Sequence, residues 1–320
     1  IARFDRLKDT GLTFIGMGVS GGEEGARHGP SIMVGGTQQS YARVEKVLTS
    51  IAARYQGDPC CAWLGEDGAG HFVKTIHNGI EYADMQMIAE IYGVLRDGLG
   101  KSAGEIGAIF GQWNRGRLNS YLIEITEKVL TTTDPETGRP MVDMILDRAG
   151  QKGTGKWSAI EAQQMGVPAT AIEAAVAARS LSSMKAEREA AETLFGTPSY
   201  AFPLKDGAAL MSDLELALFA AKIGAYAQGF AVMAEASREF GWSLPMPTIA
   251  RIWRAGCIIR AQFLDTIAKA YAAEPELPAL LLACAVLAAP SAQALELIEA
   301  WRAALRHDPQ YAAARAARDA

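Results

Sequence analysis

Five polar side chains follow one another at helical spacing in residues 70–92. They are an amine, an imidazole, an amide, a carboxylate and a phenol, namely Lys74, His77, Asn78, Glu81 and Tyr82. At about 100° per residue they fall in an arc of roughly 140° and span about 12 Å of a helix. A face that is only solvated is usually rich in Glu, Lys and Arg. The pattern therefore favours a functional site, with a solvated face carrying a Lys–Glu pair as the alternative.

The opposite side of the same predicted helix is apolar. It carries Val73, Ile76, Ile80, Ala83 and Met87. One side of the helix is thus predicted to pack, while the other presents the five polar groups.

A glycine-rich segment follows a predicted strand at 12–18. Residues 16–21 (GMGVSG) fit the dinucleotide pattern GxGxxG. The third glycine, however, runs into further glycines and a proline instead of opening a helix. The segment therefore favours a loop whose backbone N–H groups approach a small anion over a dinucleotide site. A plain surface loop is the alternative.

Residues 150–157 (GQKGTGKW) resemble a phosphate-binding loop incompletely. Trp157 replaces the hydroxyl that would bind Mg²⁺, and no strand precedes the segment. Lys152 and Lys156 nevertheless offer two cations on a glycine-rich loop, which suits a phosphate. A solvated loop is the alternative.

A fourth stretch, residues 177–189 (AARSLSSMKAERE), places Arg179 and Lys185 beside Ser182 and Ser183. Taken alone, it is typical of an amphipathic helix with a charged face.

The elements that position these residues change in character at residue 70. Before it, strands are predicted at 12–18, 31–36 and 60–65, with a helix at 38–55, which indicates α/β structure. After it, helical periods dominate and no β pattern is convincing. Helices are predicted at 71–99, 102–130, 142–149, 158–165, 168–189, 211–240 and 247–271, and alanine-rich helices continue to the end.

Composition excludes several classes of protein. The 320 residues are 49% hydrophobic and 21% charged, which suits a globular chain with a sizeable core. A net charge of −5 argues against non-specific nucleic-acid binding. The four cysteines form no CxxC pair, so no metal site is predicted and a reducing cytoplasm is favoured. No signal peptide is recognised, and the longest apolar run, 277–290, is too short to span a bilayer.

The stretches described above occur together, in this order, in one family. FIGMGVSGGEEGARHGPSIMVGG, HFVKTIHNGIEYADMQMIAEIY, the segment from GQKGTGKW to SSMKAERE, and AQGFAVMAEASREFGWSLPMPTIARIWRAGCIIRAQFL resemble 6-phosphogluconate dehydrogenase. The resemblance runs from about residue 5 to about residue 282. It implies NADP-dependent oxidative decarboxylation of 6-phosphogluconate to ribulose 5-phosphate and CO₂ in the pentose phosphate pathway, by a cytoplasmic homodimer that uses no metal.

The resemblance also implies a role for each matching residue. Lys74 would be the base that takes the 3-hydroxyl proton and then the acid that assists decarboxylation, and Glu81 would protonate C1. His77 and Asn78 would orient the substrate hydroxyls. The carboxylate would be held by Ser20, Gly21 and Gly22, and the phosphate by Tyr82, Lys152 and Arg179. We expect these groups to line one cleft, with Lys74 substantially buried, since a hydrated lysine is a poor base at neutral pH.

Two departures from the family shape the expected fold class. The family's upstream dinucleotide-binding unit, roughly a hundred residues, is not found before the strand at 12–18. The sequence after about residue 282 does not match either, and the family's C-terminal arginine and histidine are not placed. We therefore expect an incomplete, mainly α chain. A large all-α domain, 70–320, follows the C-terminal remnant of an α/β Rossmann-like domain, 1–69.

Three functions remain open at this point. The first is the dehydrogenase, with the NADP-binding residues unknown and no detectable NADP reduction expected from the 320-residue chain. The second is a non-catalytic remnant that binds a sugar phosphate or forms a dimer. The third is another β-hydroxyacid dehydrogenase. The apolar helices predicted at 211–240 and 247–271 are expected to be central, in a domain that self-associates.

Overall fold

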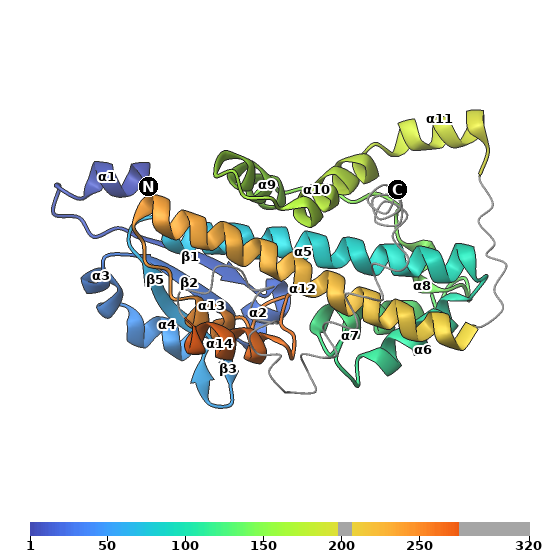
Figure 1. Cartoon of the computed structure of the whole chain (residues 1–320), viewed down its shortest axis with the longest axis horizontal. Helices are drawn as coiled ribbons and strands as arrows, with labels where there is room; N and C mark the ends of the chain where they lie inside the picture. Colours follow the sequence, from blue (N-terminus) through green and yellow to red (C-terminus); the bar gives the residue numbers. More distant parts are fainter. Residues whose placement is uncertain (198–206, 275–320) are drawn as a thin grey trace, which may run out of the picture.

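Two long helices lie side by side through the middle of the molecule (Figure 1). They are α5 (Ala69–Gly93) and α12 (Gly207–Phe240), in a computed structural model that describes residues 1–197 and 207–274. The predicted alanine-rich helices at the end of the chain lie outside the described residues.

A small mixed sheet packs against the first part of α5. Its strands are β1 (Ile15–Ser20), β2 (Ser31–Gly36) and β5 (Cys61–Gly65), in the order β1-β2-β5. Strand β2 runs parallel to β5 but antiparallel to β1, with Met17 opposite Val34. The short helix α1 (Ala2–Leu7) precedes the sheet. The fold class expected from the sequence is confirmed: a β–α segment is followed by a large helical part.

Two local predictions in this segment were wrong. The presumed loop after Gly21 is a short helix, α2 (Gly22–His28), and Gly21 is its N-cap at a φ of 115°. The helix predicted at 38–55 is divided into α3 (Gln38–Ala42) and α4 (Glu45–Ile51).

A hairpin of β3 (Arg54–Tyr55) and β4 (Asp58–Pro59) follows α4. Gln56 and Gly57 turn it with φ values of 52° and 92°, and two positive φ angles are the mark of a type I′ turn.

The helical part is more divided than the periodicity predicted. Helix α5 continues into a π-helix, Val94–Gly98. The other helices are α6 (Ala103–Trp113), α7 (Tyr121–Thr131), α8 (Met141–Met144), α9 (Thr154–Gln164), α10 (Thr170–Ser183), α11 (Lys185–Phe195), α13 (Met246–Ile252) and α14 (Leu264–Ala273). Single helices predicted at 102–130, 168–189 and 247–271 were therefore wrong.

Capping explains one of these divisions clearly. Ser120 lies in extended conformation before α7, and its hydroxyl accepts a hydrogen bond from the N–H of Ile123. A side chain that satisfies a free N–H in this way begins a new helix.

Helix α12 is a core element. By length and composition alone its segment Ala209–Phe240 could cross a membrane. Tyr226, Phe230 and Met233 are nevertheless fully buried, in a cluster that also contains Ile76 and Ile80 of α5. The central position expected for this helix is therefore confirmed.

Candidate active site

The glycines of the dinucleotide-like pattern let α5 cross the sheet. A methyl group on Gly18 would overlap Lys74 Cβ and lie 2.7 Å from Lys74 Cγ, and one on Gly16 would lie 2.7 Å from His71 Nδ1. Helix α5 therefore fills the space in front of both residues. A dinucleotide pyrophosphate does not fit at residues 16–21, which agrees with the interpretation drawn from the sequence.

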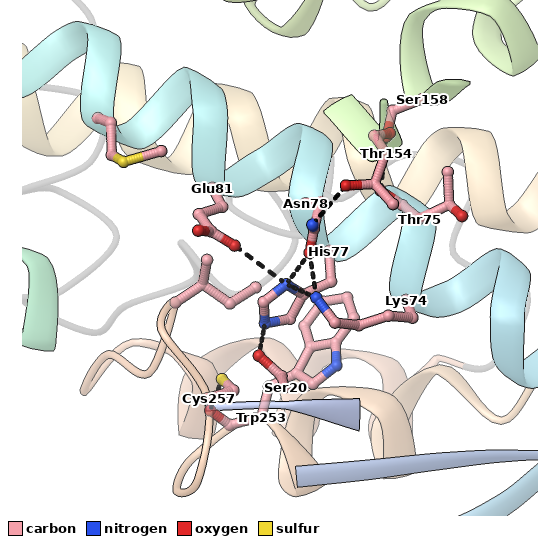
Figure 2. Close-up of polar contacts among 12 residues, drawn as sticks. Ser20, Lys74, Thr75, His77, Asn78, Glu81, Thr154, Ser158, Trp253 and Cys257 are labelled. Carbon is pink, nitrogen blue, oxygen red and sulfur yellow. Dashed lines mark hydrogen bonds and ion pairs between the residues drawn. The ribbon is translucent and has the colours of Figure 1, made fainter. Parts of the chain in front are cut away.

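Four of the five polar side chains of α5 converge on one point (Figure 2). Lys74 Nζ donates a hydrogen bond to Asn78 Oδ1 and lies 3.4 Å from His77 Nδ1. The same imidazole nitrogen lies 3.2 Å from Asn78 Oδ1 and 3.7 Å from Glu81 Oε2. The spacing in the sequence thus produces a cluster that contains an amine, an imidazole and a carboxyl group.

His77 is fully enclosed, although the sequence pattern placed it on the polar side of the helix and not on the side predicted to pack. Its Nε2 lies 3.2 Å from the hydroxyl of Ser20, the last residue of β1. Its ring meets the indole of Trp253 edge-on, with centroids 5.5 Å apart. Burial, together with the charge of Lys74, lowers the pKa of His77 well below its usual value. The imidazole is therefore neutral at neutral pH.

The pKa values of Lys74 and Glu81 are shifted toward one another. Burial lowers the pKa of Lys74, and the nearby charge of Glu81 opposes this shift. Burial raises the pKa of Glu81, against the charges of Lys74 and Arg179. The expected burial of Lys74 is met in part, since its side chain is half-buried. A lysine that loses its proton more easily and a carboxyl group that keeps it suit a base and an acid at neutral pH.

Helix α9 closes one side of the cluster. Asn78 Nδ2 donates to Thr154 Oγ1 over 2.6 Å, and Ser158 Oγ donates to the carbonyl oxygen of Thr75 over 2.5 Å. A methyl group on Gly155 would lie 2.5 Å from the Tyr82 ring, so this glycine permits the close approach of α9 to α5. Thr154 and Ser158 were not predicted from the sequence. The likeness of this segment to a phosphate-binding loop pointed to its lysines, and a threonine and a serine in a helix give no signal of their own.

Tyr82 and Arg179 are brought together as predicted. The guanidinium carbon of Arg179 lies 4.3 Å from the centre of the Tyr82 ring, and Arg179 Nη1 donates to the carbonyl oxygen of Gly150. Lys152 is different. It is exposed, and the structure shows it no hydrogen bond or ion pair to any residue within 1–197 or 207–274. It stands two residues before Thr154, at the margin of the cluster.

The predicted carboxylate-binding residues lie at the end of β1. Ser20 is buried and its hydroxyl contacts His77, which links the strand to the cluster. Gly21 and Gly22 have φ values of 115° and 55°, which favour glycine. A methyl group on Gly21 would lie 2.6 Å from the carbonyl oxygen of Gly256, so the turn is packed against the loop before α14.

A buried ion pair near the cluster had no signal in the sequence. Lys222 of α12 contacts both carboxylate oxygens of Asp84 on α5, at 2.5 and 2.6 Å, and both side chains are almost completely buried. The pair joins the two central helices one turn beyond Glu81. In the described part of the chain, no group of three or more His, Cys, Asp or Glu residues is placed to hold a metal ion.

Comparison with known proteins identifies the relatives of this chain. Residues 70–317 match the family model described as 6-phosphogluconate dehydrogenase, C-terminal domain, and residues 1–65 match the NAD binding domain of 6-phosphogluconate dehydrogenase. The NADP(+)-dependent decarboxylating 6-phosphogluconate dehydrogenase of Bacillus subtilis is 51% identical over 88% of this chain and 60% of its own length. The NAD(+)-dependent enzyme of the same organism is 49% identical, with the same coverage.

A solved structure agrees with these matches. Plasmodium falciparum 6-phosphogluconate dehydrogenase, determined in its apo form and with its cofactor NADP+ or its substrate 6-phosphogluconate, has a TM-score of 0.84 and 39% identity. The match includes 96% of the chain described here and 68% of the Plasmodium falciparum chain. The chain spans about 60% of the length of the Bacillus subtilis relatives.

Proposed function

The chain belongs to the 6-phosphogluconate dehydrogenase family, and from this membership we propose that the protein oxidises and decarboxylates 6-phosphogluconate to ribulose 5-phosphate and CO₂. The observation that carries the proposal is the convergence of Lys74, His77 and Glu81 on one enclosed point. Matching an amine of lowered pKa with a carboxyl group of raised pKa supplies the base and the acid that this chemistry needs.

The substrate has a carboxylate at one end and a phosphate at the other. Ser20 with Gly21 and Gly22 is proposed to bind the carboxylate. Tyr82, Arg179 and Lys152 are proposed to bind the phosphate. The contact of Arg179 with Tyr82 supports the second assignment, because an arginine and a phenol side by side provide several donors for a phosphate dianion. His77 and Asn78 then lie between the two ends, where they would orient the hydroxyl groups.

The proton chemistry follows from this placement. Neutral Lys74 accepts the proton of the 3-hydroxyl group as this carbon is oxidised. The resulting ammonium group returns a proton to the 3-oxygen as CO₂ leaves, which neutralises the developing enolate. Protonated Glu81 then delivers a proton to C1 of the enediol while Lys74 takes back the proton of the same 3-oxygen, which becomes the carbonyl oxygen of ribulose 5-phosphate. A nicotinamide cofactor, when bound, accepts the hydride. NADP is proposed, and no residue is assigned to it because its pyrophosphate does not fit at residues 16–21.

We also propose that two copies of the chain associate in the cytoplasm. Large apolar side chains are exposed on α8 to α11 and the segment after α8, which supports an interface there. They are Met144, Ile145, Leu146, Trp157, Ile160, Leu181, Met184, Leu194 and Phe195. The division into an α/β domain, 1–69, and a helical domain, 70–320, remains a proposal. It is supported by the start of α5 at Ala69.

NADPH formation tests the proposed reaction directly. The protein expressed from its complete reading frame is mixed with 6-phosphogluconate and NADP, and absorbance at 340 nm and CO₂ release are followed, with the 320-residue chain assayed beside it. Lys74→Met removes the amine. We expect the rate to fall by about 10²- to 10⁴-fold while the substrate still binds. Lys269→Met, at an exposed lysine of α14, is the matched control and should keep full activity.

The outcomes separate the alternatives. If Lys74→Met keeps most of its activity, Lys74 is not the base. If the expressed protein binds 6-phosphogluconate but forms no NADPH, it is a non-catalytic sugar-phosphate-binding protein instead.

A further inference from the structure

The proposed reaction leaves the protein with a proton in the wrong place. The hydride leaves with the nicotinamide and CO₂ leaves uncharged, so the proton lost from the 3-hydroxyl group finally balances the one gained by C1. No proton is released to the solvent in the overall reaction. After one turnover, however, Lys74 carries a proton that it lacked, and Glu81 lacks a proton that it carried. One proton must therefore pass from Lys74 to Glu81 before the next turnover. This requirement rests on the proposed function.

The structure joins the two groups through a single atom. Among the described residues no ion pair connects Lys74 to Glu81. Each of them instead faces Nδ1 of His77, at 3.4 Å from Lys74 Nζ and 3.7 Å from Glu81 Oε2 (Figure 2). A typical hydrogen bond of this kind is about 2.9 Å long. The two separations are about 0.5 and 0.8 Å longer, which small torsional changes in two long side chains remove.

The surroundings of His77 restrict other routes. The imidazole is completely buried, and the Glu81 side chain is only 14% exposed. Nε2 is held by the Ser20 hydroxyl, and Trp253 covers one edge of the ring. A ring held in this way cannot turn away from the pair, and little water reaches it from outside.

We propose that His77 is the proton relay that restores Lys74 and Glu81 after each turnover. In the tautomer with its hydrogen on Nε2, which donates to Ser20 Oγ, the free lone pair of Nδ1 takes a proton from the Lys74 ammonium group. One N–H bond breaks on the lysine, and one forms on the imidazole. The imidazolium then gives the proton on Nδ1 to the Glu81 carboxylate, and an O–H bond forms. Two opposite charges become two neutral groups, and no electrons are exchanged with another molecule.

Asn78 is placed to steady the intermediate. Its Oδ1 lies 3.2 Å from Nδ1 and also accepts from Lys74, while its amide nitrogen is fixed by Thr154. The oxygen therefore accepts a hydrogen bond from Lys74 before the transfer and from the imidazolium Nδ1–H after it. The low pKa of His77 agrees with a carrier that holds the proton only briefly.

The decisive measurement compares the first turnover with the following ones. In His77→Asn an amide replaces the titratable ring. With the protein in excess over 6-phosphogluconate, formation of the first NADPH needs no relay, and its rate should fall less than about tenfold. With substrate in excess, the steady-state rate should fall about 100-fold or more, because general acid–base assistance is commonly worth that much. His28→Asn, at an exposed histidine of α2, is the matched control and should leave both rates unchanged.

A second readout needs no nicotinamide cofactor. In D₂O the unmodified protein should replace a C1 hydrogen of ribulose 5-phosphate by deuterium, observed by NMR, because the proton taken by Glu81 passes on to Lys74 and exchanges. His77→Asn should bind the same sugar phosphate but exchange at least about tenfold more slowly.

Three results would overturn the relay. Equal losses in the first turnover and the steady state would mean that His77 only positions the substrate. An unchanged steady-state rate in His77→Asn would show that the proton returns by another route. If the unmodified protein forms no NADPH at all, the proposed function itself fails, and the relay fails with it.

Discussion

Replacing Gly18 by alanine should push β1 and α5 apart at Lys74. The added methyl group would overlap Lys74 Cβ, lie 2.7 Å from Lys74 Cγ and lie 3.0 Å from the carbonyl oxygen of Gly70. These atoms belong to the backbone and to the base of a side chain, so a change of rotamer does not relieve the contact. Overpacking of this kind costs about 1–3 kcal/mol. Alanine also lowers the conformational entropy of the unfolded chain, which stabilises the folded state by about 0.4–1 kcal/mol. We therefore expect the free energy of unfolding to fall by about 1–2 kcal/mol in total.

Urea unfolding measures this loss. The control is Gly224→Ala in α12, where a methyl group would meet nothing within 4 Å and the backbone is helical. Alanine at that position should raise the free energy of unfolding by about 0.5–1 kcal/mol. Both variants should keep the denaturant slope of the unmodified protein. A Gly18→Ala protein as stable as Gly224→Ala would refute the close approach of the strand to the helix, and with it the placement of Lys74.

Three further perturbations test the charges around the cluster. Lys222→Met leaves the Asp84 carboxylate buried and unpaired, so urea unfolding should show a loss of about 3–5 kcal/mol, and an unchanged midpoint would contradict the pair. The raised pKa of Glu81 means that the folded state binds its proton more tightly. As the pH rises above 4.5, the unfolded state loses this proton first, so the free energy of unfolding falls. The melting temperature of Glu81→Gln, relative to that of the unmodified protein, should therefore increase over that range. The lowered pKa of His77 has the opposite consequence. The unfolded state takes up a proton below pH 6.5, so stability should fall as pH falls through that value, and His77→Asn should lose this dependence.

The polar row on α5 was predictable because it depends on local geometry. Residues three, four and seven positions apart lie on one side of any helix, so Lys74, His77, Asn78 and Glu81 had to face a common direction. The sequence did not indicate that His77 would be enclosed. Its cover comes from Ser20 and from Trp253, which are remote from it along the chain.

Element boundaries were less predictable for a related reason. Apolar periodicity continues across a break when the helices on both sides bury residues in the same core. The break itself depends on a few groups, such as the Ser120 cap or the Gln56–Gly57 turn. The antiparallel pairing of β1 with β2 could not be read from periodicity either, because alternation along a strand is the same in both directions.

The glycine pattern at 16–21 shows the limit of a short motif most clearly. Gly-x-Gly after a strand indicates that something approaches the backbone closely. In a dinucleotide-binding fold that partner is a pyrophosphate. Here His71 and Lys74 of α5 occupy the space in front of Gly16 and Gly18. The same spacing therefore serves to bring a reactive lysine against a strand, and only the element on the opposite side decides between the two uses.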